Sequence, residues 1–206
     1  MRKQGVLITL EGPEGSGKST QIKNMVRYFK RKGIRPVLLR EPGATKVGEA
    51  IREILLHLKV NSMAPETELM LYLAARAQVV HEKILPALRQ KKIVICDRFE
   101  DSTLAYQGFG RGLSVSQIQQ ASRLVRGILK PNLTILLDID PKLGFLRIQR
   151  GRDRMERAPL SFHRKVRRGF LTLAKQEPRR FFVVDARQHE SEITEIIQRK
   201  LDHVFC

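Results

Sequence analysis

Short apolar runs alternate with longer amphipathic stretches along the whole chain, and this alternation predicts strands and helices in turn. Continuous runs of apolar, often β-branched residues are typical of buried strands, whereas apolar residues at every third or fourth position indicate helices. The predicted strands are Val6–Leu10, Pro36–Leu39, Ile93–Cys96, Leu133–Leu137 and Phe181–Val184. The predicted helices cover about 18–32, 48–58, 65–85 and 114–129, a segment beginning near 141, one ending near 174, and one beginning near 191.

Continuous apolar strands separated by helices predict a parallel sheet covered by helices on both faces. The 206 residues suffice for one well-buried domain, and no repeat, low-complexity tract or linker divides them. We therefore expect a single α/β domain over residues 1–206, built on a doubly wound parallel sheet of five strands. Ligands bind beyond the carboxyl ends of such strands, so the polar residues that follow each strand are the candidates for chemistry.

The turn after the first predicted strand has the sequence of a phosphate-binding loop. Residues 12–19 fit the pattern G-x-x-x-x-G-K-[ST], and they lie between a predicted strand and a predicted helix. Backbone N–H groups of such a loop, together with the helix N-terminus, form a cradle for phosphate oxygens. We expect Lys18 to reach the β- and γ-phosphates of a nucleoside triphosphate, and the Ser19 hydroxyl to bind Mg²⁺. The predicted nucleotide-binding residues are Gly12, Pro13, Glu14, Gly15, Ser16, Gly17, Lys18, Ser19 and Thr20.

Charged residues follow the next two strands in positions that suit phosphate and metal chemistry. Asp97 is placed as a metal-linked carboxylate, and Arg98 beside it as a phosphate-binding guanidinium. Arg40, Arg52 and Arg76 add more guanidinium groups than ATP alone requires. This surplus predicts two anionic substrates held face to face, which favours a small-molecule kinase over a nucleotide switch or a motor.

Two further carboxylates directly follow the last two predicted strands, and for them the simpler interpretation is structural. Asp138 and Asp185 each precede a predicted helix. A short acidic side chain at that position commonly caps the first turn of a helix. We therefore expect both of them to be helix caps.

Hydropathy and cysteine content narrow the class of protein further. Hydrophobic residues make up 42% of the chain, and no apolar run is long enough to span a bilayer or to act as a signal peptide. Of the two cysteines, Cys96 lies within an apolar strand, which predicts a small buried thiol and no disulfide framework. We expect a cytoplasmic protein that has no membrane partner.

The formal net charge of +18 leaves two interpretations open. A strongly basic surface can bind nucleic acid, but it can equally accompany a site built for polyanionic nucleotides. Lysines and arginines are spread along the chain, no basic run is interleaved with aromatic residues, and no DNA- or RNA-binding module is recognisable. The sequence therefore speaks against a nucleic-acid partner. The rival hypothesis, a P-loop nucleic-acid-binding protein, predicts steeply salt-dependent binding to DNA or RNA.

Four motifs taken together resemble bacterial thymidylate kinases, a family of P-loop nucleoside monophosphate kinases. They are the phosphate loop at 11–20, Arg-Glu-Pro-Gly at 40–43, Ala-Ala-Arg-Ala-Gln at 74–78, and the segment 97–108. Their order and spacing match over nearly the full chain. The resemblance implies a P-loop kinase fold and transfer of the γ-phosphoryl group of ATP to dTMP, with Mg²⁺ as cofactor. It also implies a homodimer, built from helices such as the one predicted over 65–85.

The resemblance also assigns roles around the acceptor phosphate and the sugar. It implies that Glu14 hydrogen-bonds the 3′-hydroxyl of dTMP. Arg98, with Arg40 and Arg52 nearby, would hold the acceptor phosphate, and Asp97 would help to position Mg²⁺. Because the acceptor is already an anion, no strong general base is required.

A second group of roles concerns the base. The resemblance implies that Arg76 donates to a thymine carbonyl, that Thr103 and Gln107 read the base edge, and that Tyr106 excludes a ribose hydroxyl. Tyr72 lies one helical turn before Arg76 and would stack on the base. On spacing alone, a helix tyrosine is more often a core residue. A kinase for another nucleoside monophosphate is the nearest rival, with dUMP as a possible second substrate.

A basic segment at about 147–160 is expected to form a short lid over the donor phosphates. One subtype of the family carries a catalytic arginine in the phosphate loop, at the position that Gly15 occupies here. The lid is then the expected source of that positive charge. Arg150 or Arg152 would contact the transferred phosphoryl group, and the sequence leaves the choice between them open.

Overall fold

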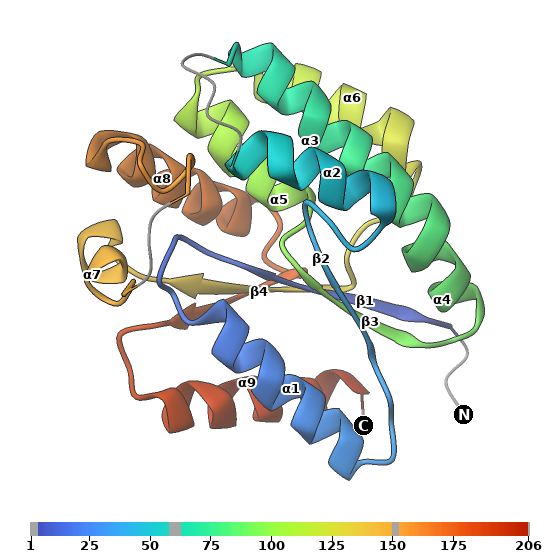
Figure 1. Ribbon diagram of the computed structural model, residues 1–206. Coiled ribbons are helices and arrows are strands. Elements are labelled where there is room, and N and C mark those ends of the chain that lie inside the picture. The colour runs from blue at the N-terminus through green and yellow to red at the C-terminus, as the bar shows by residue number, and fades with distance from the viewer. Residues whose placement is uncertain (1–3, 58–62, 150–152, 206) are drawn as a thin grey trace.

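The predicted sheet is confirmed by a computed structural model, which describes residues 4–57, 63–149 and 153–205 (Figure 1). One parallel sheet has the strand order β2-β3-β1-β4-β5. Its strands are β1 (Val6–Glu11), β2 (Val37–Arg40), β3 (Ile93–Asp97), β4 (Leu133–Asp138) and β5 (Phe181–Asp185). Each begins within a residue of its predicted start, because runs buried on both faces carry a strong signal.

Helices cover both faces of the sheet. Figure 1 shows α1 and α9 on one face, with α2, α3, α4, α6 and α8 over the other. The helices are α1 (Lys18–Arg31), α2 (Lys46–Leu56), α3 (Pro65–Val79), α4 (Leu85–Arg89), α5 (Glu100–Thr103), α6 (Val115–Arg126), α7 (Pro141–Leu146), α8 (Leu160–Gln176) and α9 (Glu190–Phe205). None of them, within the described ranges, is long and apolar enough to cross a bilayer.

The register of the sheet brings the predicted polar residues to one edge. Leu10 of β1 lies opposite Asp97 of β3 on one side and Ile135 of β4 on the other. Arg40 at the end of β2 also lies opposite Asp97. Because all five strands run the same way, the phosphate loop after β1 and the residues that end β2 and β3 converge at the carboxyl edge.

Two π-helical turns were not predicted from the sequence. The helix expected over 65–85 ends at Val79 and continues through a π turn, η1 (Val80–Ile84), into α4. The second π turn, η2 (Leu104–Gly110), follows α5 and packs against α8. A Cβ atom at Gly110 would lie 2.6 Å from the ring of Phe162 on α8, so only glycine permits this contact. Such turns are frequent at functional sites, but the periodicity of apolar residues does not predict them.

The prediction that Asp138 and Asp185 cap helices is wrong. The cap of α7 is Asp140, whose side chain accepts a hydrogen bond from the backbone N–H of Lys142 at 2.8 Å. Asp138 instead receives two hydrogen bonds from Arg167 of α8, at 2.7 and 2.8 Å. Asp185 accepts from the backbone and the guanidinium of Arg187. Both helices begin too far beyond the strand ends for these carboxylates to reach the first turn.

Candidate active site

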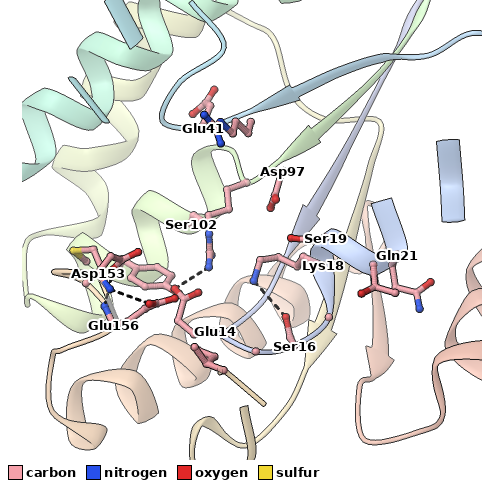
Figure 2. A pocket seen from close by; sticks show the side chains of 18 of the residues that line it. Glu14, Ser16, Lys18, Ser19, Gln21, Glu41, Asp97, Ser102, Asp153 and Glu156 are labelled. Carbon is pink, nitrogen blue, oxygen red and sulfur yellow. Dashed lines mark hydrogen bonds and ion pairs between the residues drawn. The ribbon is translucent and has the colours of Figure 1, made fainter. Parts of the chain in front are cut away.

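A cavity of about 1030 Å³ lies at the carboxyl edge of the sheet (Figure 2). Its walls come from the phosphate loop, the ends of β2 and β3, α3 and η2, and from residues near 148 and 188. Most of the predicted site residues line this cavity. They are residues of the phosphate loop, or they carry a charged or hydrogen-bonding side chain. Those that line it are Glu14, Gly15, Ser16, Gly17, Lys18, Ser19, Thr20, Arg40, Arg52, Tyr72, Arg76, Asp97, Arg98, Thr103, Tyr106 and Gln107. Gly12 and Pro13 do not line it, and Arg150 and Arg152 lie outside the described residues.

The phosphate loop has a backbone that only glycine adopts readily. Gly15 and Gly17 have φ angles of 69° and 90°, in the left-handed region. A Cβ atom on Gly15 would lie 1.9 Å from the carbonyl oxygen of Gly144, because α7 packs directly on the loop. Lys18 begins α1 and folds back, and its Nζ donates to the carbonyl oxygens of Gly12 at 3.0 Å and Pro13 at 2.9 Å. Burial, followed by repulsion from Arg98, lowers the pKa of Lys18 to about 8.

Arg98 connects the phosphate loop with η2. Its backbone is left-handed, with φ 68°, an uncommon conformation for a side chain of this size and one that clusters at functional sites. Its Nη2 donates to Glu14 Oε1 at 2.9 Å, and the Tyr106 hydroxyl donates to the same oxygen at 2.6 Å. Burial raises the pKa of Glu14, but Arg98, Lys18 and Tyr106 more than offset this and lower it to about 2. Glu14 is therefore ionised at neutral pH.

A buried carboxyl group beneath Arg98 holds the backbone after this residue in place. Glu11, the last residue of β1, accepts a hydrogen bond from the backbone N–H of Phe99 at 2.7 Å and another from the Ser102 hydroxyl. Ser102 in turn accepts from Nη1 of Arg98 at 3.1 Å. Burial, followed by repulsion from Asp101, raises the pKa of Glu11 to about 8. Sequence reasoning assigned no role to Glu11 or Ser102, because the contact joins residues about ninety positions apart.

Replacing Glu11 with glutamine is expected to change how stability depends on pH. The Glu11 pKa is raised from 4.5 to about 8 in the folded chain, so between these values only the unfolded chain loses the proton. Raising the pH from about 5 to about 8 should therefore cost the wild type a few kcal/mol of unfolding free energy relative to Glu11→Gln. Urea unfolding of both proteins across this range measures the difference. A difference that is constant with pH would contradict the raised pKa.

Arg76 lies at the opposite wall and is held by two anchors. The residue is only 1% exposed; its Nε donates to Glu41 Oε2 at 2.8 Å and its Nη2 to Thr103 Oγ1 at 2.9 Å. The Nη1 atom is buried and has no hydrogen-bond partner in the described part of the chain. A buried guanidinium donor without a partner is costly, and it lies in a residue that lines the cavity. The arrangement leaves one donor for a carbonyl group of a ligand.

Asp97 and Ser19 have the chemistry of a magnesium site. Figure 2 shows the two side chains facing the same space beside Lys18. The Asp97 Oδ1 atom is buried and lacks a hydrogen-bond partner among the described residues. No group of three or more His, Cys, Asp or Glu residues able to hold a metal occurs in the same part of the chain. One carboxylate and one hydroxyl suit Mg²⁺, which keeps several waters and takes phosphate oxygens as further ligands.

Two arginines expected at the acceptor phosphate, and two that lie within the predicted lid segment 147–160, have protein partners. Arg40 pairs with Glu49 at 2.9 Å, and Nη1 of Arg52 donates to the carbonyl of Pro42 at 2.9 Å. The other two are Arg147, which donates to the Ala186 carbonyl at 2.8 Å, and Arg154, which donates to the Leu55 carbonyl at 2.6 Å. Arg154 is thus tied to the end of α2.

One wall of the cavity was missed by sequence reasoning. Arg187, Gln188, His189 and Glu190 line the cavity beside the phosphate loop. They follow β5, so the rule that polar residues beyond strand ends carry the chemistry could have found them. Only Asp185, at the end of that strand, was considered.

The fold and the site together define a class of protein. A phosphate loop and an arginine-rich second subsite face one cavity at the carboxyl edge of a doubly wound parallel sheet, which is the arrangement of a P-loop kinase that acts on a small phosphorylated substrate.

Comparison with known proteins identifies the particular family. The family model described as Thymidylate kinase matches residues 10–197. Thymidylate kinase of Deinococcus radiodurans is 50% identical over 192 residues, covering 92% of this chain and 93% of that protein. The protein of the same name from Protochlamydia amoebophila is 46% identical over 200 residues, covering 92% and 89%. The crystal structure of thymidylate kinase from Ehrlichia chaffeensis superposes with a TM-score of 0.77 at 34% identity, covering 96% and 98%. The chain belongs to the thymidylate kinase family, and it is an enzyme.

Proposed function

We propose that this chain transfers the γ-phosphoryl group of ATP to dTMP, giving dTDP and ADP, with Mg²⁺ as cofactor. One observation carries the proposal beyond the family match. The carbonyl oxygen of Gly12 accepts hydrogen bonds from both Lys18 Nζ, at 3.0 Å, and Arg98 Nη1, at 3.1 Å. The cation of the donor subsite and the cation of the acceptor subsite are therefore neighbours. Phosphoryl transfer needs this closeness, because catalysis consists mainly of alignment and charge neutralisation.

In the proposed complex, the phosphates of ATP and the phosphate of dTMP are each held by a separate set of charged residues. Lys18 and the loop backbone hold the β- and γ-phosphates of ATP, and Arg98, with Arg40 and Arg52, holds the phosphate of dTMP. Glu14 accepts a hydrogen bond from the 3′-hydroxyl of the sugar. Asp97 and Ser19 would hold Mg²⁺, which supplies positive charge to the phosphate oxygens when bound. Arg150 or Arg152 is proposed to add a cation from the lid.

The base is proposed to lie between α3 and η2. Tyr72 stacks on its face, and burial raises the pKa of its hydroxyl, so the ring is neutral at physiological pH. Arg76 directs its unpartnered Nη1 to the O4 carbonyl of thymine. Thr103 anchors Arg76, and Gln107 faces the N3 position. The donor of Arg76 favours a pyrimidine with a carbonyl group at C4, as in thymine and uracil, over cytosine, which carries an amino group there.

The test is an ADP-release assay with ATP and Mg²⁺ against dTMP, dUMP, UMP and dCMP. We expect selective turnover of dTMP. Turnover of a different monophosphate would preserve the kinase and overturn the base-reading residues. Absence of turnover, together with steeply salt-dependent binding to DNA or RNA, would favour the nucleic-acid-binding alternative.

Replacing Tyr106 with leucine is expected to weaken the preference for deoxyribose over ribose. The Tyr106 ring lies against Phe162 and Phe170, at centroid distances of 6.1 Å each, and under the guanidinium of Arg98. We place this ring beside C2′ of the sugar. Tyr106→Leu should lower the kcat/KM ratio of dUMP to UMP by about tenfold.

The matched control is Tyr106→Phe. It keeps the ring and removes only the hydroxyl that donates to Glu14, so the ratio of dUMP to UMP should stay near the wild-type value. Equal changes in both variants would show that the ring is not the sugar gate.

We further propose a cytoplasmic homodimer. Cys96 is buried with a free thiol, in line with a reducing compartment. Met70 on α3 and Leu124 on α6 are large apolar residues that are 57% and 88% exposed, and α3 packs on α6. A second copy that covers this face would bury both. Light scattering should give about twice the chain mass of 23.7 kDa, and the chain mass itself would contradict the dimer.

A further inference from the structure

Glu68 is a buried carboxylate beside Gln107, a residue of the cavity wall, and it has no role in the proposed function so far. It lies on α3, one turn before Tyr72, and it is 1% exposed. A fully buried acidic side chain is rare unless it is paired, and here three side chains converge on it.

Both carboxylate oxygens of Glu68 are occupied. Its Oε1 accepts a hydrogen bond from Nε2 of Gln107 at 2.8 Å and from Nε of Arg111 at 3.1 Å. Its Oε2 accepts from Nη2 of Arg111 at 3.0 Å and forms an ion pair with Arg154 at 2.7 Å. The two guanidinium groups approach from different elements, so the carboxylate is held in one orientation.

The charge state of Glu68 is fixed by these partners. Burial raises the pKa of its carboxyl group, but the hydrogen bonds from Arg111 and Gln107 and the charge of Arg154 more than offset this and lower the pKa below its usual range. Glu68 is therefore ionised at neutral pH. An ionised carboxylate can only accept hydrogen bonds.

Because Glu68 only accepts hydrogen bonds, it fixes the orientation of the Gln107 side-chain amide. A glutamine amide has one donating end and one accepting end, and rotation of the group by half a turn exchanges them. Because Glu68 can only accept, Gln107 must direct its NH₂ group toward Glu68, and a turned amide would bring two acceptors together. Gln107 also lines the cavity, and no hydrogen bond to its Oε1 is found among the residues described. The accepting end is left for a ligand.

We infer that Glu68 is a positioning residue that sets the base specificity of this site by fixing the polarity of Gln107. The inference rests on the proposed dTMP kinase activity. An acceptor at Gln107 Oε1 pairs with the N3–H donor of thymine or uracil, whereas N3 of cytosine is itself an acceptor and is rejected. A site built to pair a substrate N–H discriminates strongly against an analogue that lacks it, because the buried polar group is left unpaired.

Glu68→Gln tests this inference directly. An amide at position 68 both donates and accepts, so Gln107 becomes free to present either end to the base. The substrates are dTMP, dUMP and 5-methyl-dCMP, which keeps the methyl group of thymine but has an acceptor at N3. We expect the kcat/KM ratio of dTMP to 5-methyl-dCMP to fall by about tenfold in Glu68→Gln. The ratio of dTMP to dUMP should stay within about twofold of wild type, because both bases carry N3–H.

Two controls separate polarity from a general structural effect. Arg111→Lys keeps a positive charge beside Glu68, so Glu68 stays ionised and Gln107 keeps its orientation, and neither ratio should change. In a Gln107→Leu background, Glu68→Gln should no longer alter the ratio of dTMP to 5-methyl-dCMP, because the group through which it acts is gone. Unchanged selectivity in folded Glu68→Gln, or an equal loss in Arg111→Lys, would overturn the inference.

A reciprocal variant keeps the inference testable if Glu68→Gln does not fold, as judged by circular dichroism. Glu68→Gln with Gln107→Glu moves the carboxylate to position 107, where it again presents an acceptor to the base. This folded double variant should keep the wild-type selectivity, and a loss of about tenfold would overturn the inference. If the wild type turns over dTMP but its variants fail these tests, only the role of Glu68 is wrong. If the wild type does not turn over dTMP, the proposed function falls, and this inference with it.

Discussion

Lys18→Met is expected to lower kcat by about a thousandfold while the affinity for dTMP changes by less than about threefold. Lys18 is buried at the start of α1, and its ammonium group is held by two loop carbonyls within the donor subsite. Charge develops on the transferred phosphoryl group, so loss of this cation removes stabilisation that acts mainly in the transition state. Methionine fills the volume of the lysine stem and limits the structural damage.

Steady-state kinetics combined with calorimetric binding of dTMP measure both quantities. The matched control is Lys23→Met, on the exposed side of the same helix, which should leave kcat unchanged. Loss of turnover together with loss of dTMP binding would mean that the variant damaged the fold. A kcat of Lys18→Met within tenfold of the wild-type value would contradict the proposed role of Lys18 in stabilising the transition state.

Arg76→Lys is expected to raise the KM for dTMP by about thirtyfold and the KM for ATP by less than about twofold. The planar guanidinium binds Glu41 and Thr103 and has a third donor, Nη1, left over. A single ammonium group cannot reproduce this fork. Lysine is preferred to alanine here, because alanine would leave Glu41 as an unpaired buried charge, at a cost of about 3–5 kcal/mol of stability.

The companion variant for Arg76 is Thr103→Val. It removes one anchor of the guanidinium but keeps Nη1, so the KM for dTMP should rise by less than about fivefold. Initial rates with each substrate varied at saturating levels of the other give both KM values. Equal increases in the KM values for dTMP and ATP after Arg76→Lys would contradict the base-reading role, and the thermal unfolding midpoint shows whether the fold has been weakened.

The sequence was informative wherever neighbouring residues carry the signal. The five strands are continuous apolar runs, and the phosphate loop needs glycine at positions where φ is positive, so both could be predicted from local patterns. The polar residues beyond β1 and β3 were also found, because the topology of a parallel sheet fixes where strand ends meet. The resemblance to thymidylate kinases, which rests on short motifs, is confirmed by the family match over residues 10–197.

The π turn η2 shows where local patterns fail. It packs closely against α8 at Gly110, and glycine by itself argues against a helix. The failed caps at Asp138 and Asp185 have a similar cause. Their carboxylates are held by arginines, and for Asp138 that arginine lies on α8, which the order of strands and helices does not reveal.

By itself, the sequence determined the fold class, the phosphate loop and the family, because each depends on the periodicity or the order of residues close together in the chain. Only the tertiary structure decided how the site residues are held. Glu11 under Arg98, Glu41 beside Arg76 and Glu68 beside Gln107 join residues 35 or more positions apart. Each of these contacts is buried, where a polar group without a hydrogen-bond partner is costly, and the partner is fixed by packing, which a linear pattern does not contain.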